Sequence, residues 1–321
     1  MKLSIELKTL STLLLLVSFG SLLAQNENAG TSGFDTLKLA YSARASAMGG
    51  AMLGLEQSFD ALEYNPAAYI RTPNRAVSST IMSHLVGSGG GSISYIMPQN
   101  KFVAWAASLR YWNSGPIDRT DITPTGELVE LGESFSAQSI VGTISTSRYI
   151  SDALDLGGSI KFIYDSIDES NASALMIDIG ILHHTVNENI KVGLSARNIG
   201  VQISHYSQDK YSEGLPAVFG AGIGIRMKQN IHTALDITKA SGENIVARIG
   251  IEYGISPDLH LRTGFRSNAG DYGMGGSLGW TGGLSFGAGW QIKRIHLDYA
   301  LSSYGDLGFT NQLSLRYNFT E

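Results

Sequence analysis

From Ala76 to the end of the chain, apolar and polar residues alternate with a period of two, and this pattern constrains the fold more than any other feature. In residues 154–165, for example, Ile160 and Phe162 fall on one face of a strand, and Lys161 falls on the other. Successive side chains of a strand point to opposite faces, so each such segment has one apolar face and one polar face.

About fourteen segments of this kind follow one another, which is an even number, and an even number is typical of bacterial outer-membrane barrels. They are residues 76–85, 92–97, 102–112, 134–149, 154–165, 174–184, 190–198, 217–227, 231–239, 245–254, 259–266, 283–291, 294–302 and 310–319. Within lipid every backbone polar group has to be hydrogen-bonded, and a sheet achieves this only by closing on itself. The sequence therefore predicts an all-β fold, a transmembrane antiparallel β-barrel of about 14 strands over residues 76–321.

The connections between these segments alternate in length. Short connections alternate with long ones, and the long ones include residues 113–133, 199–216 and 267–282. Outer-membrane barrels have short periplasmic turns and longer outer loops, so the three long connections are expected on the outer side.

Residues 1–25 have the pattern of a secretory signal peptide. Lys2 and Lys8 supply the positive charge, and a mainly apolar run from Leu10 to Leu23 follows. The alternative is an uncleaved membrane anchor, but such a helix needs about 20 apolar residues, and this run is shorter. The chain has no cysteine and therefore no disulfide bonds. Its net charge of −5 argues against a nucleic-acid partner. We therefore expect export, with a cleaved signal peptide, to the bacterial outer membrane.

Residues 26–75 differ from the rest, because they are rich in small residues and show helical spacing over residues 38–70. Leu39, Ala43 and Ala47 recur at every fourth position, and Pro66 disfavours helical backbone at Asn65. This segment is too apolar for a free tail and too short for a separate domain. The sequence predicts a short helical plug or hatch inside the barrel mouth or lumen, with a stabilising periplasmic cap as the alternative.

The polar faces of the predicted strands carry charges of both signs. The charged positions expected to face the lumen are Lys161, Asp178, Arg197, Arg226, Asp236, Arg248, Glu252, Arg262 and Asp298. A ring of one sign would indicate ion selectivity, and this set shows none. A selective polar pore and a set of mutually paired charges bracing the lumen are both compatible with the pattern, and we favour the second.

The motifs that would indicate catalysis, a metal or a cofactor lack their structural context. His183 and His184 are neighbours on a strand and point to opposite faces, so they cannot easily share one metal ion. The repeat Gly220-x-Gly222-x-Gly224 lies on a strand without a following helix, unlike a phosphate loop. Such strand glycines make room for a group filling the lumen or let the wall curve. We predict a non-enzymatic protein with no catalytic residue, no metal and no cofactor.

The segment before the first strand resembles the opening of the PorV/PorQ family of FadL-like outer-membrane barrels. The resemblance lies in residues 29–38, in Asn65-Pro66-Ala67, and above all in Ser42-Ala43-Arg44-Ala45-Ser46-Ala47-Met48-Gly49-Gly50-Ala51. On this resemblance the motif positions of the plug are Ser42, Arg44, Met48, Gly49, Gly50, Asn65 and Pro66.

The resemblance implies a fourteen-stranded barrel with an N-terminal hatch, surrounded by outer-membrane lipid, and one of two functions. PorV-like members serve type IX secretion, where the partners are the secretion machinery and the C-terminal domains of its substrates. FadL-like members take up hydrophobic small molecules, so the partner would be a hydrophobic ligand. We expect the first function and keep uptake as the alternative.

Overall fold

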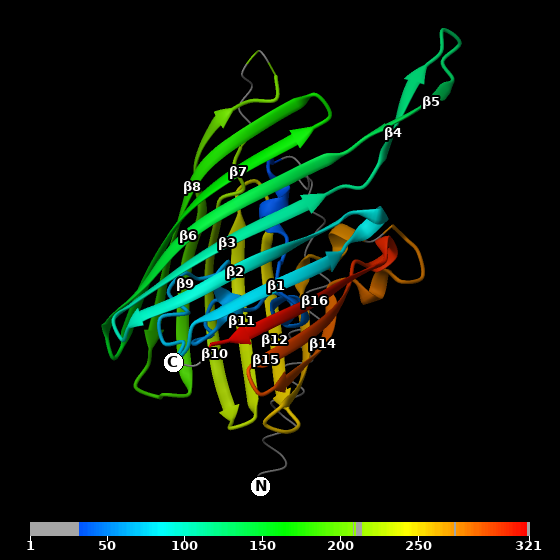
Figure 1. Cartoon of the computed structure of the whole chain (residues 1–321). Coiled ribbons are helices and arrows are strands. Elements are labelled where there is room, and N and C mark those ends of the chain that lie inside the picture. The colour runs from blue at the N-terminus through cyan, green and yellow to red at the C-terminus, as the bar shows by residue number, and fades with distance from the viewer. Residues whose placement is uncertain (1–31, 208, 210–213, 273, 320–321) are drawn as a thin grey trace.

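The computed structural model describes residues 32–319 except 208, 210–213 and 273, and it confirms the predicted closed barrel (Figure 1). Fourteen antiparallel strands form the wall in the order β1-β16-β15-β14-β13-β12-β11-β10-β9-β8-β7-β6-β3-β2. The first and last strands close it, with Ala76 opposite Asn318 and Ser83 opposite Asn311. The signal-peptide prediction, residues 1–25, lies outside the described residues.

The strands have the following bounds: β1 Ala76–Ser83, β2 Gly89–Asn100, β3 Val103–Asn113, β4 Ile117–Ile122, β5 Leu128–Phe135, β6 Ala137–Ser151, β7 Leu154–Ile167, β8 Ser170–His184, β9 Ile190–Ser204, β10 Val218–Lys228, β11 Ile231–Ala240, β12 Ile245–Gly254, β13 Leu259–Arg266, β14 Leu284–Ile292, β15 Ile295–Ser303 and β16 Phe309–Asn318. The helical elements are α2 Ala43–Ala47 and the 3-10 helices η2 Asp35–Lys38, η3 Phe59–Ala61, η4 Leu85–Gly87, η5 Ser267–Tyr272, η6 Gly279–Thr281 and η7 Gly305–Leu307. In the described part of the chain, no helix is long and apolar enough to cross a membrane.

The outer face of the barrel is apolar and its inner face is polar, the reverse of a soluble protein. Along β8, Leu175, Ile177 and Ile179 are 44–51% exposed, whereas Met176 and Asp178 between them are buried. A surface covered with exposed Ile, Leu, Phe and Tyr is stable where lipid surrounds it. The alternation in the sequence therefore has a physical cause: the apolar positions face lipid, and the polar positions face the lumen.

The outer loops differ from the sequence prediction. Residues 113–133 are not an irregular loop, because β4 and β5 pair there as a separate two-stranded sheet that projects from the upper end of the barrel (Figure 1). The turn between β7 and β8 is only residues 168–169, and β9 continues to Ser204, six residues past the predicted end. In β9 the alternation itself continues past residue 198, with Ile199, Val201 and Ile203 exposed on the outer face, so the prediction ended this strand too early.

The N-terminal segment, residues 32–75, runs inside the barrel and is less helical than its sequence predicts. Only Ala43–Ala47 is α-helical, and the Ser42 hydroxyl caps it by accepting a hydrogen bond from the Ala45 N–H. The helix ends because Gly49 and Gly50 adopt left-handed φ angles of 65° and 79°. The remainder consists of the 3-10 helices η2 and η3 and of turns, and its backbone hydrogen bonds go to the wall as well as to itself.

Candidate functional site

The N-terminal segment is the main occupant of the lumen, and its residues are among the most buried in the chain. Ala43, Ala45, Ala47, Met48 and Met52 are fully buried. The backbone N–H groups of Met52 and Leu53 both donate to Asp236 Oδ2, at 2.7 and 3.0 Å. The segment is therefore held by the wall through its backbone as well as through apolar packing.

The wall approaches this segment most closely at strand glycines. A Cβ atom on Gly264 would overlap the backbone of Met48 and Gly49, and one on Gly193 would overlap Leu53. The same overlap would occur at Gly157 with Pro66 and at Gly224 with Gly54. The strand glycines thus make room for the backbone that fills the lumen, which is one of the two roles expected for them.

The motif residues Asn65 and Pro66 fix a second anchor point. The Asn65 side-chain amide donates to Leu53 O at 2.9 Å and to Ile181 O at 3.0 Å, which ties the segment to itself and to β8. Asn65 is fully buried, and Gly180 on β8 leaves room for both Asn65 and Pro66. In the motif, Gly49 leaves no room for a side chain, because a Cβ there would lie 2.8 Å from Phe265 N.

An alternating chain of charges, here called the base network, joins the segment to β12, β13 and β15. It consists of Asp60, Arg44, Glu252, Arg262 and Asp298. Arg44 Nε lies 2.8 Å from Glu252 Oε2, Arg262 Nε lies 2.6 Å from the same oxygen, and Arg262 Nη1 lies 2.5 Å from Asp298 Oδ1. Asp60 Oδ2 is 3.7 Å from Arg44 Nη1, and its Oδ1 accepts a hydrogen bond from Ser42.

Two further groups of charges hold the segment on the opposite wall. Glu63 accepts a hydrogen bond from Ser108 at 2.6 Å and lies 3.5 Å from Arg110 and 3.7 Å from Lys161. Lys161 in turn pairs with Asp178 at 2.7 Å. Burial alone would raise the pKa of the Glu63 carboxyl, but the charges of Arg110 and Lys161 outweigh it and lower the pKa to about 2.

The other group surrounds Glu56. This carboxylate lies 3.4 Å from each of Lys191, Arg226 and His184. His184 Nε2 is 2.7 Å from Asp155, which also pairs with Arg71 of the segment at 2.8 Å. The sequence singled out His184 only as a weak metal candidate, whereas in the structure it bridges two carboxylates.

Of the nine charged positions expected in the lumen, six lie in or against these groups and three do not. Lys161, Asp178, Glu252, Arg262 and Asp298 are buried and paired, Asp236 binds the segment backbone, and Arg226 is largely exposed beside Glu56. Arg197 and Arg248 are the two that have no carboxylate within 4.0 Å in the described residues. Arg197 Nη1 donates to the backbone oxygen of Glu63 at 2.9 Å, and Arg248 Nη1 donates to Thr238.

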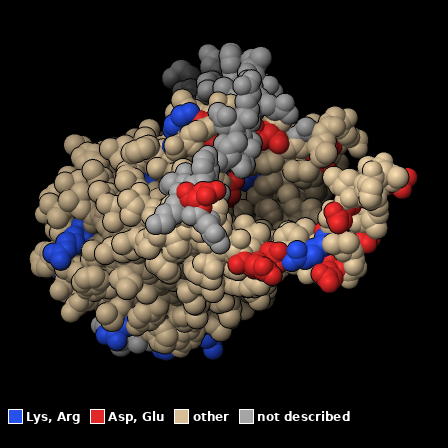
Figure 2. Space-filling view, turned by 90° about the horizontal axis from the view of Figure 1, so that it is seen from above, with Lys and Arg blue, Asp and Glu red and all other residues tan. Residues whose placement is uncertain are grey.

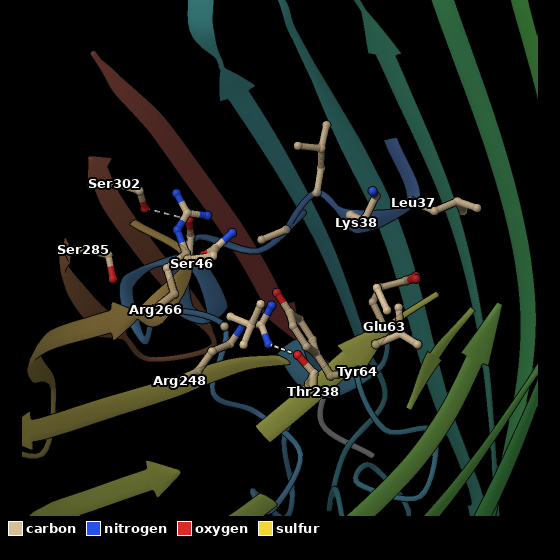
Figure 3. Close-up of a pocket in the computed structure, with 18 of the residues that line it drawn as sticks. Leu37, Lys38, Ser46, Glu63, Tyr64, Thr238, Arg248, Arg266, Ser285 and Ser302 are labelled. Carbon is tan, nitrogen blue, oxygen red and sulfur yellow. Dashed lines mark hydrogen bonds between the residues drawn. The ribbon is translucent and has the colours of Figure 1, made fainter. Parts of the chain in front are cut away.

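Above the segment lies a cavity of about 460 Å³ (Figure 3). Its floor is formed by the segment, including Gly50, Leu53 and Tyr64, and its wall includes Arg197, Arg248 and Arg266. Seen from above, the barrel end is hollowed next to the projecting β4–β5 hairpin (Figure 2). The volume lies within the range of small-molecule sites. The lining mixes charged, aromatic and aliphatic side chains, which differs from the apolar pocket that uptake of hydrophobic compounds would favour.

Several solved structures share this fold over most of the chain, and their titles name hydrocarbon channels, a transporter and a FadL homologue. The "TodX deltaS2S3 mutant monoaromatic hydrocarbon channel" is 14% identical with a TM-score of 0.61, over 87% of this chain and 99% of that chain. The toluene transporter TbuX of Ralstonia pickettii is 14% identical with a TM-score of 0.61, over 88% and 99%. A FadL homologue of Pseudomonas aeruginosa is 11% identical with a TM-score of 0.57, over 87% and 98%.

At these identities the likeness shows the fold alone. No family model matches the chain, and no curated protein matches it. The three structures are channels or transporters by their titles or are homologous to FadL, so they give no support to the PorV/PorQ resemblance in particular.

Proposed function

We propose that this protein is an outer-membrane channel that passes small, partly apolar molecules through its lumen past the N-terminal segment. Uptake through the barrel is the alternative function that the sequence predicts. The cavity between the segment and the outer end carries the proposal, because it is of ligand size and is closed below by the segment. The fold likeness to hydrocarbon channels supports it. A non-enzymatic role in the bacterial outer membrane is part of the same proposal.

Passage requires the N-terminal segment to shift, since its backbone touches the wall at Gly193 and Gly264. The segment is held by ion pairs and hydrogen bonds as well as by apolar clusters, and the polar contacts can be exchanged for water one at a time. A solute that binds in the cavity more tightly when the segment has moved would shift the population toward the open state.

The direct test is solute entry into proteoliposomes. Purified protein is reconstituted, and the entry of radiolabelled terephthalamide, a small neutral aromatic solute, is compared with its entry into protein-free liposomes. The proposal predicts protein-dependent entry that is lost when the protein is thermally unfolded before reconstitution. Equal rates with and without folded protein would contradict it.

Type IX secretion remains a second candidate, and one observation favours it. The β4–β5 hairpin projects away from the barrel and exposes Ile122, Leu128 and Leu131 together with several carboxylates, which is a surface suited to a protein partner (Figure 1). Deleting residues 117–135 would then abolish surface display of secreted substrates while solute entry stays unchanged. Unaltered display would remove this candidate.

A further inference from the structure

The imidazole ring of His184 lies between two carboxylates at the lower end of the barrel. Its Nε2 is 2.7 Å from Asp155 Oδ2 on β7, and its Nδ1 is 3.4 Å from Glu56 Oε2 on the N-terminal segment. Asp155 is fully buried, and the His184 side chain is nearly so. One imidazole therefore joins the wall to the segment that fills the lumen.

A neutral imidazole cannot donate to both acids. It carries a single N–H, and its other nitrogen is an acceptor. Asp155 makes the shorter contact, so in a neutral ring the proton stays on Nε2, and the lone pair of Nδ1 then faces the Glu56 carboxylate. A protonated ring donates from both nitrogens. The contact between His184 and Glu56 is therefore attractive only when the ring is protonated.

The other charges at this site are cations that pair with the same two acids. Lys191 on β9 and Arg226 on β10 each lie 3.4 Å from Glu56, and Arg71 of the segment pairs with Asp155 at 2.8 Å. These cations oppose protonation of the ring, but the ring's own contacts are with the carboxylates, and charge interactions weaken with distance and with screening by water. They also keep part of the hold on Glu56 when the ring is neutral, so loss of the proton loosens the contact without abolishing it.

The position of His184 makes this contact sensitive to the surrounding pH. His184 is the last residue of β8, next to a short turn of the kind found on the periplasmic side. Its neighbour His183 is exposed on the outer face, so this end of the strand lies at the membrane surface. Histidine changes its charge between about pH 5 and 8. The base network and the group around Glu63 contain no histidine.

We propose that His184 is a pH-sensitive latch on the N-terminal segment, which holds Glu56 against the wall when the ring is protonated and loosens the lower part of the segment when the ring is neutral. Protonation stabilises the closed state, so closure is favoured at low pH and is lost as the pH rises through the titration of the ring. This inference rests on the proposed function and adds to it a means of regulation.

The first test follows terephthalamide entry into proteoliposomes between about pH 5.5 and about pH 8.5, a range that covers the titration of histidine. The solute stays neutral over this range, so its own charge does not change. We expect entry to be at least about threefold faster at the upper pH, because one hydrogen bond between charged groups is lost from the closed state.

Two substitutions of the latch residue fix its charge in opposite ways. His184→Gln is neutral at every pH of the test, so entry should be fast and independent of pH. His184→Lys is charged throughout, so entry should be slow and independent of pH. The matched control is His183→Gln, because His183 is the neighbouring histidine and points to the opposite face of β8. This control should keep the pH profile of the unaltered protein.

The second test reads the segment itself and needs no transport. The chain has no cysteine, and Leu55, beside Glu56, is buried. Leu55→Cys is labelled with N-ethylmaleimide in the folded, detergent-solubilised protein, and its rate is divided by that of Val186→Cys, whose position is fully exposed. The division removes the ordinary effect of pH on thiol reactivity. We expect the ratio to rise at least about threefold with pH, and to stay constant with pH when His184→Gln is added.

The outcomes separate the latch from the channel. If terephthalamide enters and neither its entry nor the labelling ratio depends on pH, the latch is wrong and the channel function stands. If His184→Gln folds, as a heat-dependent shift in electrophoretic mobility shows, and keeps the pH profile of the unaltered protein, another group is responsible and the latch is again wrong. If labelling follows pH as expected but terephthalamide enters at no pH, His184 holds the segment and the channel function fails.

Discussion

Strands β12 and β13 carry two cross-strand pairs of charged residues that differ in sign. Near the lower end Glu252 is opposite Arg262, and the two side chains form part of the base network. Further up the same two strands Arg248 is opposite Arg266, and no carboxylate oxygen of the described residues lies within 4.0 Å of either guanidinium. One pair has complementary charges and forms an ion pair, and the other pair places two like charges opposite each other.

The comparison also separates the two expectations for the lumen. The lower lumen, where Arg44, Asp60 and Glu252 meet, matches the expectation of mutually paired charges that brace the barrel. The cavity above does not, because its charges are paired less completely. The two parts of the lumen therefore differ in how completely their charges are paired.

The largest expected change in the free energy of unfolding comes from breaking the ion pairs of Glu252 in the base network. Glu252→Gln leaves Arg44 and Arg262 buried around an uncharged amide. Removing one partner of a buried charge pair costs about 3–5 kcal/mol of the free energy of unfolding. Urea titration of the detergent-folded protein measures this value. A loss below about 1 kcal/mol would mean that the base network does not brace the segment.

The next largest effect is expected from a strand glycine of the wall that contacts the backbone of the N-terminal segment. Gly264→Ala places a methyl group on the backbone of Met48 and Gly49, so we expect a loss of about 2–3 kcal/mol and exposure of the segment to protease. Gly142→Ala is the control, since a Cβ there would meet nothing within 4 Å. Equal protease resistance of the two folded variants would contradict the docking of the segment.

A smaller effect depends on pH. The Glu63 carboxylate has a pKa of about 2 in the folded protein, below its usual value of 4.5, so its charge stabilises the fold above about pH 4.5. That contribution is lost as the pH falls from about 4.5 to about 2. Glu63→Gln should therefore destabilise the protein by about 2 kcal/mol at pH 7, and the difference should vanish near pH 2. A difference that is independent of pH would show that the Glu63 charge is not responsible.

The smallest expected change in stability concerns the like-charged pair of Arg248 and Arg266. Arg248→Met removes a charge that opposes Arg266 and replaces it with a shorter, uncharged and apolar side chain. We expect a change within about 1 kcal/mol, or a gain in stability, because no buried carboxylate within ion-pair distance loses its partner. Urea titration beside Glu252→Gln makes the comparison. A loss as large as that of Glu252→Gln would show that Arg248 is structural.

Most of the barrel was predictable, because a strand between lipid and lumen has alternating apolar and polar residues, and this alternation is visible within each short segment of the sequence. Segments such as residues 245–254 and 259–266 coincide with β12 and β13, since each inward or outward residue is selected for one solvent. The β4–β5 hairpin also had a local signal, which the sequence reading missed. Residues 123–126, Thr-Pro-Thr-Gly, form a turn sequence between two alternating runs.

The site was less predictable, because it depends on which residues the register places opposite each other. The sequence indicated that Arg248, Glu252 and Arg262 face inward, but only the pairing of β12 with β13 sets Glu252 against Arg262 and Arg248 against Arg266. The contact between Gly264 and the N-terminal segment joins positions more than 200 residues apart in the chain. No local pattern encodes such pairs.

Movement of the N-terminal segment is the central requirement of the proposed channel function, and a reversible crosslink tests it most directly. The chain has no cysteine, and Ser46 Oγ on α2 lies 3.0 Å from Ser302 Oγ on β15, so Ser46→Cys with Ser302→Cys can join the segment to the wall. The control is Ser173→Cys with Ser204→Cys, whose hydroxyl oxygens lie 2.8 Å apart on the neighbouring strands β8 and β9.

The measurement is terephthalamide entry into proteoliposomes with each disulfide oxidised and then reduced. We predict that oxidation of the 46–302 pair stops entry, that reduction restores it, and that the 173–204 pair has no effect in either state. Undiminished entry through the oxidised 46–302 protein would show that solutes do not pass by movement of the segment, and it would contradict the account.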